Sequence, residues 1–353
     1  MASIKDVASK AGVSISTVSN VINGKKYVSA ELTQKVLQAI DELNYEVDLI
    51  ARSLKNNRTM TIGVIITSLN RIFIPQVLNG LQKGAEAYGY HLLIYATNEE
   101  IELEKKYLQI LINSKVDGII IDTVADVADE AYYQQLARLE KGNKKIPVVS
   151  IERDLSRYSI CSVYADNVKS AFRATSHLIE SGCSKILHIS GPKVIEMVLC
   201  RTKGYQEALR EHGLAVSPIY TAEGDFSPLS GYRVVKQMVN DGVEFDGIFA
   251  DNDQMAIGAI KALREYEFKI PEHIKLVGFD NTFVSSIVKP SLSTINVPKY
   301  RMGWVAAENL CRMIEEETGR NDRGRYSVEL TTNLMVREST CGMNVENWDL
   351  EGW

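Results

Sequence analysis

Hydrophobic positions in the first fifty residues recur at the spacing of short amphipathic helices. Apolar side chains follow Ser3 at three- and four-residue intervals, and Gly12 then predicts the end of a first helix. Ser14 can cap a second helix over 15–22, and a third is expected to follow Ser29. The pattern therefore predicts three small helices, of which the first two are joined by a tight Ala-Gly-Val-Ser turn.

The second of these helices has a short polar outer face. Val18, Val21 and Ile22 point inward, which leaves the remaining side chains largely outside. Two helices joined by such a turn form a helix-turn-helix, whose second helix fits the major groove of DNA. For an arbitrary turn of this kind, the alternative is a small helical bundle without a nucleic acid partner.

Beyond Thr59 the pattern changes to apolar runs that alternate with amphipathic helices. TIGVII precedes a helix over 74–88, and a further helix over 100–114 precedes VDGIIID. The alternation recurs after residue 168, with helices over 202–212 and 254–265 among others. Right-handed crossovers turn such an alternation into a doubly wound parallel sheet, so two similar α/β lobes are predicted.

Between these two regions lies a short basic stretch, YEVDLIARSLKNNRT. Asp48 can cap a helix over 48–55, in which Ala51 and Leu54 form an apolar strip and Lys55 adds positive charge. So short a helix does not persist alone in water. We therefore expect it to form only when something packs on it.

The segment IKDVASKAGVSISTVSNVIN closely resembles the amino-terminal DNA-binding segment of the LacI/GalR family of bacterial transcription regulators. The resemblance continues through ARSL and the body of the chain to about residue 340. It implies that the start of the second helix reads bases, that the nearby polar residues and lysines touch phosphate, and that two junction helices pair and insert a leucine into the minor groove. The DNA-binding residues so implied are Ile15, Ser16, Thr17, Ser19, Asn20, Lys25, Lys26, Ala51, Leu54 and Lys55.

The resemblance also implies the domain organisation. The fold class is a small all-α helix-turn-helix DNA-binding domain followed by an α/β periplasmic-binding-protein-like body of two doubly wound parallel-sheet lobes. The chain would cross between the lobes near Cys161, Ser291 and Gly324, with STINVP at one crossing. The boundaries are 1–58 for the DNA-binding domain with a hinge helix at about 48–55, 59–340 for the effector-binding and dimerisation domain, 60–161 with 292–323 for the N-lobe, 162–290 with 325–340 for the C-lobe, and 341–353 for a tail.

Acids, amides and hydroxyls follow the predicted strands of the body. Lobes of this kind bind ligands outside the carboxyl ends of their strands. Carboxylates and amides can hold the vicinal hydroxyls of a sugar or nucleoside in paired hydrogen bonds. Any single strand-end acid can instead merely cap the following helix. The residues at these positions are Thr67, Asp122, Glu152, Asp251, Asn252 and Asp280.

Three segments resemble the effector site of the LacI/GalR family. ADNDQMAIGA and LVGFDN imply Asn252, Asp253 and Asp280 as effector contacts, and CRTKGY implies Arg201. An ordinary solvated position at a helix start is the alternative for that arginine. Apolar walls of the site are expected at Phe73 and Phe226.

Two departures from the family pattern bear on the effector. The segment KVIEMVLC, which precedes Arg201, is bulkier than the small or polar residues often found there. Glu152 stands where an aspartate is common. Both alter the size or charge of the pocket, so the effector's identity does not transfer from the family.

Composition excludes several other classes of protein. The chain has 353 residues, 45% of them hydrophobic, and a net charge of −5, which suits two or three ordinary domains. Its five cysteines form no CxxC pair, and no apolar run reaches the length of a membrane span. The polar start MASIKDVASK does not resemble a signal peptide, so we expect a cytoplasmic protein.

No enzymatic chemistry is indicated. The five histidines form no HxxxH or HxH spacing, and no GxGxxG or GxxxxGK[ST] loop follows a predicted strand. We therefore expect no catalytic residue, cofactor or metal.

The sequence thus predicts a ligand-responsive regulator, most simply a repressor of carbohydrate genes, that binds a palindromic operator in double-stranded DNA as a homodimer. The tail lacks the leucine heptads of a tetramerising bundle. Control by a nucleoside, a purine or a partner protein remains an alternative within this class. Outside it, the alternatives are a solute-binding protein, which would carry a signal peptide and no head, and a sugar-modifying enzyme.

Overall fold

The structure is a computed structural model that describes residues 2–23, 26–45, 58–142, 144–316 and 327–341. The chain divides into two units, Met1–Thr59 and Met60–Trp353, which we call the head and the body. The helix predicted over 48–55 lies outside the described residues, and so do Lys25, Ala51, Leu54 and Lys55.

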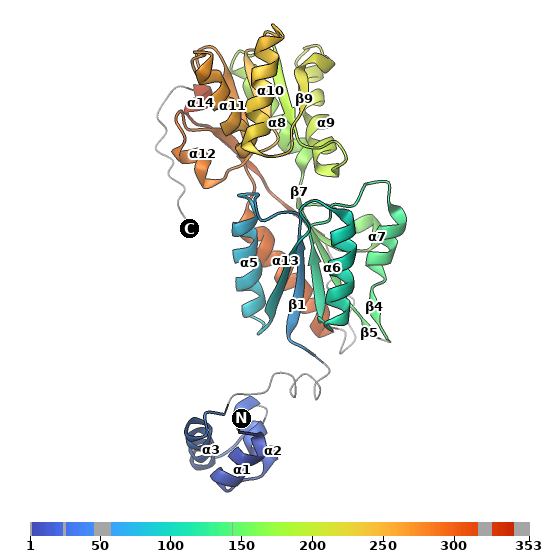
Figure 1. Cartoon of the computed structure of the whole chain (residues 1–353), viewed down its shortest axis with the longest axis vertical. Coiled ribbons are helices and arrows are strands. Elements are labelled where there is room, and N and C mark those ends of the chain that lie inside the picture. Colours follow the sequence, from blue (N-terminus) through green and yellow to red (C-terminus); the bar gives the residue numbers. More distant parts are fainter. Residues whose placement is uncertain (1, 24–25, 46–57, 143, 317–326, 342–353) are drawn as a thin grey trace. The chain divides into compact units, whose positions relative to one another are not determined.

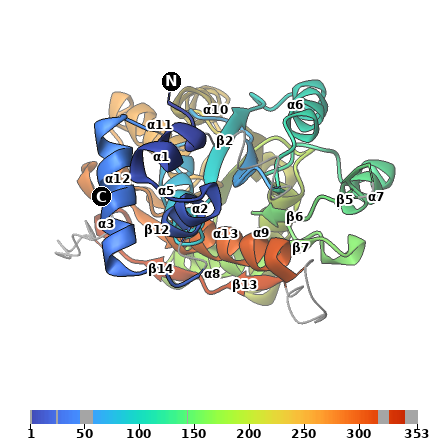
Figure 2. The same ribbon diagram turned by 90° about the horizontal axis from the view of Figure 1, so that it is seen from below.

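The described residues of the head form three helices, α1 (Ile4–Ala11), α2 (Ile15–Asn23) and α3 (Ala30–Glu42). A capping box between Ser3 and Asp6 starts α1, and Gly12 ends it with φ of 64°. The helices close around a small apolar core, and α3 lies alongside α1 (Figure 2). The buried side chains of this core are Val7, Ala8, Val18, Val36 and Ala39.

The first lobe of the body is a six-stranded sheet in the order β13-β7-β6-β3-β1-β2, in which every pair of neighbours is parallel. Helices cover both of its faces (Figure 1). A two-stranded hairpin, β4 (Glu140–Lys141) with β5 (Lys144–Lys145), extends beside it. The elements are β1 (Thr61–Ile66), α5 (Ile74–Glu86), β2 (His91–Ala96), α6 (Ile101–Asn113), β3 (Gly118–Ile121), α7 (Glu130–Ala137), β6 (Val148–Ile151), β7 (Cys161–Ala165), α13 (Lys299–Glu316) and β13 (Val328–Leu330).

The second lobe is a six-stranded sheet in the order β14-β12-β11-β10-β8-β9. All of its neighbours are parallel except β14, which runs antiparallel to β12 because the chain re-enters this lobe from the opposite direction. The elements are α8 (Asn167–Glu180), β8 (Ile186–Ser190), α9 (Glu196–Glu211), β9 (Thr221–Glu223), α10 (Pro228–Asn240), β10 (Gly247–Ala250), α11 (Asp253–Glu265), β11 (Lys275–Asp280), α12 (Phe283–Ile287), β12 (Ser293–Asn296), β14 (Asn333–Met335) and α14 (Glu338–Cys341).

The three chain crossings between the lobes lie later in the sequence than predicted. The chain leaves the first sheet after Ala165, returns to that lobe between Asn296 and Lys299, and leaves it again after Leu330. The crossings predicted near Cys161, Ser291 and Gly324 each lie a few residues further along the chain, because β7, β12 and β13 complete their sheets before the chain crosses. STINVP does contain the second crossing, just after β12.

Successive residues of each central strand supply opposite faces of the sheet. In β1, Ile62, Val64 and Ile66 belong to the core under α5 and α13, while Ile65 belongs to the core under α6 and α7. The helices α5 and α13 touch closely, because a Cβ atom at Gly80 would lie 2.0 Å from the carbonyl oxygen of Tyr300. Burial on both faces explains why these strands appear in the sequence as continuous apolar runs.

Helix α9 begins at Glu196, well before the predicted start at Thr202. Its first turns bury Met197, Val198 and Arg201 at helical spacing, so the bulky segment before Arg201 forms part of the helix. Arg201 therefore lies within the helix and is buried, which excludes the solvated helix-start alternative.

Candidate functional site

A cleft lies in the body between the two lobes. Its walls come from the loops after β1, β2, β3 and β6 of the first lobe and from the segments around α9 and β9 of the second. This is the edge at which the carboxyl ends of parallel strands meet, as expected for a ligand site in such sheets. The lining residues are Thr67, Arg71, Glu99, Asp122, Thr123, Val124, Glu152, Arg153, Ile195, Met197 and Phe226.

The structure brings together part of the set predicted from the sequence. Thr67, Asp122, Glu152 and Phe226 line the cleft. The other predicted residues, which do not contribute to this lining, are buried in the same body: Phe73, Arg201, Asn252, Asp253 and Asp280.

The first-lobe wall is a connected ionic network. The Thr67 hydroxyl donates to Oδ2 of Asp122 at 2.8 Å. Arg71 donates through Nη1 and Nη2 to the two carboxylate oxygens of Glu152, at 3.1 and 3.4 Å. Its Nη1 also donates to Thr67 at 3.1 Å and lies 3.8 Å from Asp122. One arginine therefore holds a hydroxyl and two carboxylates in fixed relative positions.

The guanidinium of Arg71 also lies against an aromatic ring from each lobe. Its Cζ atom is 5.8 Å from the ring centroid of Phe73 and 5.2 Å from that of Phe226. Both distances are within the range of cation–π attraction. Arg71 thus joins the polar and aromatic parts of the cleft.

The second-lobe side is arranged around Arg201. Its Nε donates to Oδ1 of Asn167 at 2.8 Å, and its Nη1 donates to the carbonyl of Asp251. Its guanidinium lies 3.7 Å from the ring centroid of Phe279. These contacts hold a buried cation behind the cleft wall.

Asn252 and Asp253 have structural partners in this lobe. Asn252 caps α11 by accepting from the Met255 amide at 2.8 Å, and it donates to the carbonyl of Phe226 at 2.9 Å. Asp253 accepts from the amide and hydroxyl of Thr282 at 2.6 and 2.9 Å, and from the Thr294 hydroxyl at 2.5 Å. Both side chains therefore anchor the loops that carry other site residues.

Asp280 differs from them, because its buried Oδ1 has no hydrogen-bond partner among the described residues. Its backbone has φ of 102°, and Glu152 and Phe226 also adopt positive φ, at 64° and 65°. Non-glycine residues in this region are strained and gather at functional sites. Strain at three predicted site residues supports a functional role for this cleft.

Asp280, Asp253 and Asp122 are harder to ionise than free carboxyl groups. Burial raises the pKa of Asp280 to about 7, although the Arg201 guanidinium opposes the shift. Burial also raises the pKa of Asp253 to about 6. At Asp122 burial and the neighbouring Glu152 carboxylate raise the pKa, against the attraction of Arg71.

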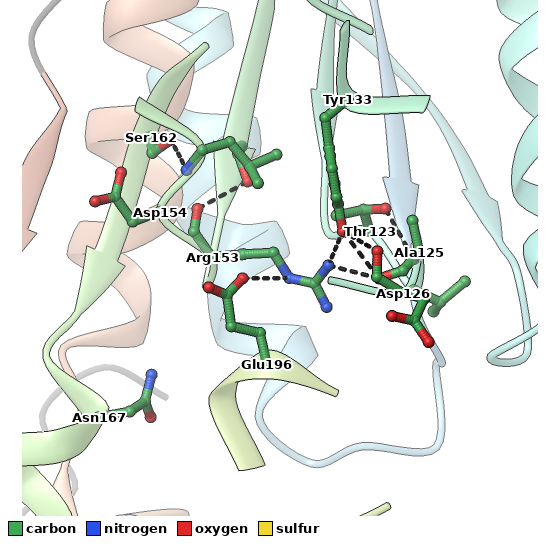
Figure 3. A network of polar contacts seen from close by, with 12 residues as sticks. Thr123, Ala125, Asp126, Tyr133, Arg153, Asp154, Ser162, Asn167 and Glu196 are labelled. Atoms are coloured by element: carbon green, nitrogen blue, oxygen red, sulfur yellow. Dashed lines mark hydrogen bonds and ion pairs between the residues drawn. The ribbon is translucent and has the colours of Figure 1, made fainter. Parts of the chain in front are cut away.

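Two sets of contacts connect the lobes beside the cleft. Gln254 at the start of α11 accepts from the Ile72 amide at 3.0 Å and donates to the carbonyl of Asn70 at 3.4 Å. Nε of Arg153 lies 3.6 Å from a carboxylate oxygen of Glu196 at the start of α9 (Figure 3). Both contacts can respond to movement of one lobe against the other.

Arg153 is fixed on the first-lobe side. Its Nη1 donates to the carbonyl of Ala125 at 2.6 Å and to the hydroxyl of Tyr133 (Figure 3). The Tyr133 ring in turn stacks on Tyr158 with centroids 4.9 Å apart. Arg153 therefore presents its remaining edge to Glu196 from a rigid support.

Sequence reasoning missed Arg71, Arg153 and Gln254. Arg153 directly follows the predicted Glu152, and Gln254 lies inside the segment ADNDQMAIGA. Arg71 stands in a polar loop after the TIGVII strand and two positions before Phe73. The positive charge of Arg71 beside Phe73, a predicted wall of the site, is the feature of the sequence that could have identified Arg71.

The DNA-contacting residues predicted in the head lie on α2 or just after it. Ile15 is 45% exposed and Ser16 is exposed, while Thr17, Ser19 and Asn20 are partly exposed. Ser14 caps the helix by accepting from the Thr17 amide at 3.1 Å. Lys26 is exposed beyond the end of α2.

Two broader features of the described residues bear on the site. No group of three or more His, Cys, Asp or Glu side chains there could hold a metal ion. In the same part of the chain, no helix is both long enough and apolar enough to cross a membrane.

Comparison with protein families matches both units. Residues 3–48 match the model of bacterial regulatory proteins of the lacI family. Residues 59–331 match the model of periplasmic binding proteins and the sugar-binding domain of the LacI family.

Individual relatives and solved structures agree with these matches. A ribose operon repressor of Halalkalibacterium halodurans is 37% identical over 98% of this chain and 100% of the relative. The repressor PurR of Pasteurella multocida is 33% identical over 96% of this chain and 98% of the relative. The lac repressor dimer bound to operator and the anti-inducer ONPF is 27% identical over 96% of this chain and 99% of that chain, with a TM-score of 0.84. The regulator CelR in complex with cellobiose is 28% identical over 96% of this chain and 100% of that chain, with a TM-score of 0.70.

Proposed function

This chain belongs to the lacI family of bacterial regulatory proteins, and we propose that it is a repressor whose affinity for operator DNA is controlled by a small neutral sugar bound in the body. The observation that carries this proposal is the cleft between the lobes. It combines hydroxyl, carboxylate and guanidinium groups with the aromatic ring of Phe226. Sugars present the complementary surface, because their hydroxyls both donate and accept hydrogen bonds and their ring faces pack on aromatic rings.

The bulk of the side chains that line the cleft favours a monosaccharide. Ile195 and Met197 belong to the bulky segment before Arg201, and both side chains line the cleft. Large apolar side chains at these positions reduce the room that a second sugar unit would need. A pentose is the first candidate, since a ribose operon repressor is similar over nearly the whole chain.

The head supplies the proposed DNA contacts. Helix α2 would enter the major groove, with Ile15, Ser16 and Asn20 at base edges and with Thr17, Ser19 and Lys26 at the phosphates or groove wall. We propose that two copies bind a palindromic operator, as in the operator-bound lac repressor dimer. Such a protein acts in the cytoplasm, where its operator lies, and it binds its sugar without converting it.

The junction helix predicted over 48–55 would transmit the signal. In this proposal a change in lobe closure alters the distance between the two junction helices and thereby their pairing in the minor groove. Leu54→Ala should then weaken binding to operator more than binding to random DNA. Equal loss on both DNAs would make this stretch a spacer.

A paired binding experiment tests the function. An operator selected from random DNA is titrated with the protein by fluorescence anisotropy, with and without pentoses, hexoses, sugar phosphates and nucleosides. We expect at least one neutral monosaccharide both to raise the thermal midpoint of the protein and to change operator affinity. Sugars recovered unchanged by chromatography would separate binding from turnover.

The other outcomes identify the alternatives. A response to a purine or nucleoside alone would favour that class of effector over a sugar. Stabilisation by a sugar without any specific DNA binding would contradict the role as a repressor. Specific DNA binding that no small molecule alters would point to control by a partner protein.

A further inference from the structure

Arg71 is an almost fully enclosed ionic group of the cleft. Its side chain is 8% exposed, and those of its partners Glu152 and Asp122 are each 7% exposed. A buried guanidinium is tolerated only where carboxylates and hydrogen-bond acceptors replace water. The surroundings of Arg71 meet that condition with two carboxylates and the Thr67 hydroxyl.

These partners together form a binding site for a planar cation. Glu152 faces the guanidinium with both of its oxygens, which is the paired geometry that carboxylates use for guanidinium ligands. Phe73 and Phe226 add ring faces from the two lobes. Such a site would attract a guanidinium or ammonium group from solution if the chain did not supply one itself.

We propose that Arg71 is a built-in ligand: its side chain fills a cation subsite formed by Glu152, Asp122, Phe73 and Phe226, and so restricts the effector to an uncharged molecule that binds beside it. The restriction to an uncharged effector rests on the proposed function. Arg71 is then a specificity-determining residue, because it occupies the part of the cleft with the strongest affinity for a cation.

The charges around the remaining space are consistent with an uncharged effector. Arg71 compensates Glu152, and Arg153 faces Glu196 across the lobes. A cationic effector would meet the positive edge of Arg71, whereas an anionic one would meet the carboxylate groups of Glu99 and Asp122. A neutral polyol avoids both repulsions and can hydrogen-bond to either kind of group.

Chemical rescue tests the subsite without knowledge of the effector. Arg71→Ala removes the internal cation and leaves space for methylguanidinium, which carries the same planar group. The thermal midpoint of the full-length variant is measured with methylguanidinium chloride, at several times its dissociation constant, and with equal sodium chloride. We expect the organic cation to raise the midpoint of the variant by about 2–4 °C and to leave the wild type unchanged or lower.

A matched double variant shows whether the rescue occurs at this site. In Arg71→Ala combined with Glu152→Gln, the paired carboxylate is absent, so methylguanidinium should give no stabilisation. Equal stabilisation of both variants, or none of Arg71→Ala, would overturn the proposal.

Measurements between pH 6 and pH 8 keep the test decisive if the single variant is unstable. Burial and the Glu152 carboxylate raise the pKa of Asp122, so Asp122 is protonated more fully at pH 6 than at pH 8. Loss of Arg71 is therefore better tolerated at pH 6, and rescue should grow towards pH 8. A variant that fails to fold at pH 6 even with methylguanidinium present would also overturn the proposal.

The restriction to uncharged effectors is tested by a separate measurement. The wild-type protein is screened by thermal shift with neutral sugars, amino sugars and sugar acids, and stabilisation by neutral sugars alone is expected. Stabilisation by a charged sugar would reject the restriction to uncharged effectors. If no sugar binds while methylguanidinium rescues Arg71→Ala, the internal ligand stands and the proposed sugar effector fails.

Discussion

The two walls of the cleft hold their charged groups by different means. On the first-lobe wall, side chains hold one another, since Arg71 pairs with Glu152 and Asp122 accepts from Thr67. On the second-lobe side, backbone groups, hydroxyls and the Asn167 amide of the same lobe satisfy Arg201 and Asp253. A network of side chains can exchange partners with a ligand, whereas groups held by backbone are fixed by the fold. The first wall is therefore suited to selecting the ligand and the second to positioning it.

The largest expected effect concerns Asp253 on the second wall. Asp253→Ala leaves the amide and hydroxyl of Thr282 and the Thr294 hydroxyl without their shared acceptor. Because these groups are buried, the free energy of unfolding should fall by about 3–5 kcal/mol, measured by urea denaturation. Asp241→Ala, at an exposed position after α10, is the control. A small decrease in the free energy of unfolding of Asp253→Ala would show that the internal contacts of this wall do not fix it.

The next largest effect is the dependence of folding stability on pH that Asp280 contributes. Its pKa is about 7 in the folded protein and near 3.9 when unfolded, so the folded state binds more protons between about pH 4 and pH 7. The contribution of this group to stability therefore falls as the pH rises through that window and is constant above it. The total change is at most about 4 kcal/mol.

Asp280→Asn removes this titration. Urea denaturation from pH 4 to pH 8 should show that the variant gains stability relative to the wild type as the pH rises. Parallel profiles would mean that folding does not shift the pKa of Asp280.

Arg201 tests whether a buried cation behind the wall still acts on the effector. Arg201→Ala should raise the effector concentration for a half-maximal change in operator affinity by about 30- to 100-fold, or about 2–3 kcal/mol. Arg210→Ala, at an exposed position on the same helix α9, is the matched control. An unchanged response in the Arg201 variant would confine recognition to the first wall.

The smallest expected effect concerns the contact between the walls. Gln254→Ala removes the hydrogen bonds to Ile72 and Asn70 across the lobes, which are worth about 1 kcal/mol together. The effector concentration for a half-maximal change in operator affinity should shift by about five-fold. A rise would mean that the sugar binds the arrangement in which these hydrogen bonds close the lobes, and a fall would mean that it binds the open one. Gln237→Ala on α10 is exposed and should have no effect. Identical behaviour of both variants would mean that the walls act independently.

Much of the architecture follows from local pattern. Ser3, Gly12 and the apolar positions of the first helices determine the head, because caps and helical periodicity act within a few residues. The buried runs of β1, β3 and β6 predict a parallel sheet covered on both faces, as the structure has it. The strand-end positions Thr67, Asp122 and Glu152 follow from the same pattern and lie together in the cleft.

Tertiary structure decided what the side chains of the cleft do. Sequence spacing does not reveal that Arg71 meets Glu152 and Phe226, since these residues come from distant segments and from both lobes. The crossings between the lobes and the early start of α9 were likewise set by sheet completion and burial, which act over the whole body. Local pattern specifies where a strand ends and which residue follows it. Only the packed lobes determine which of those residues pair with each other and which, like Asp280, keep an unpartnered oxygen.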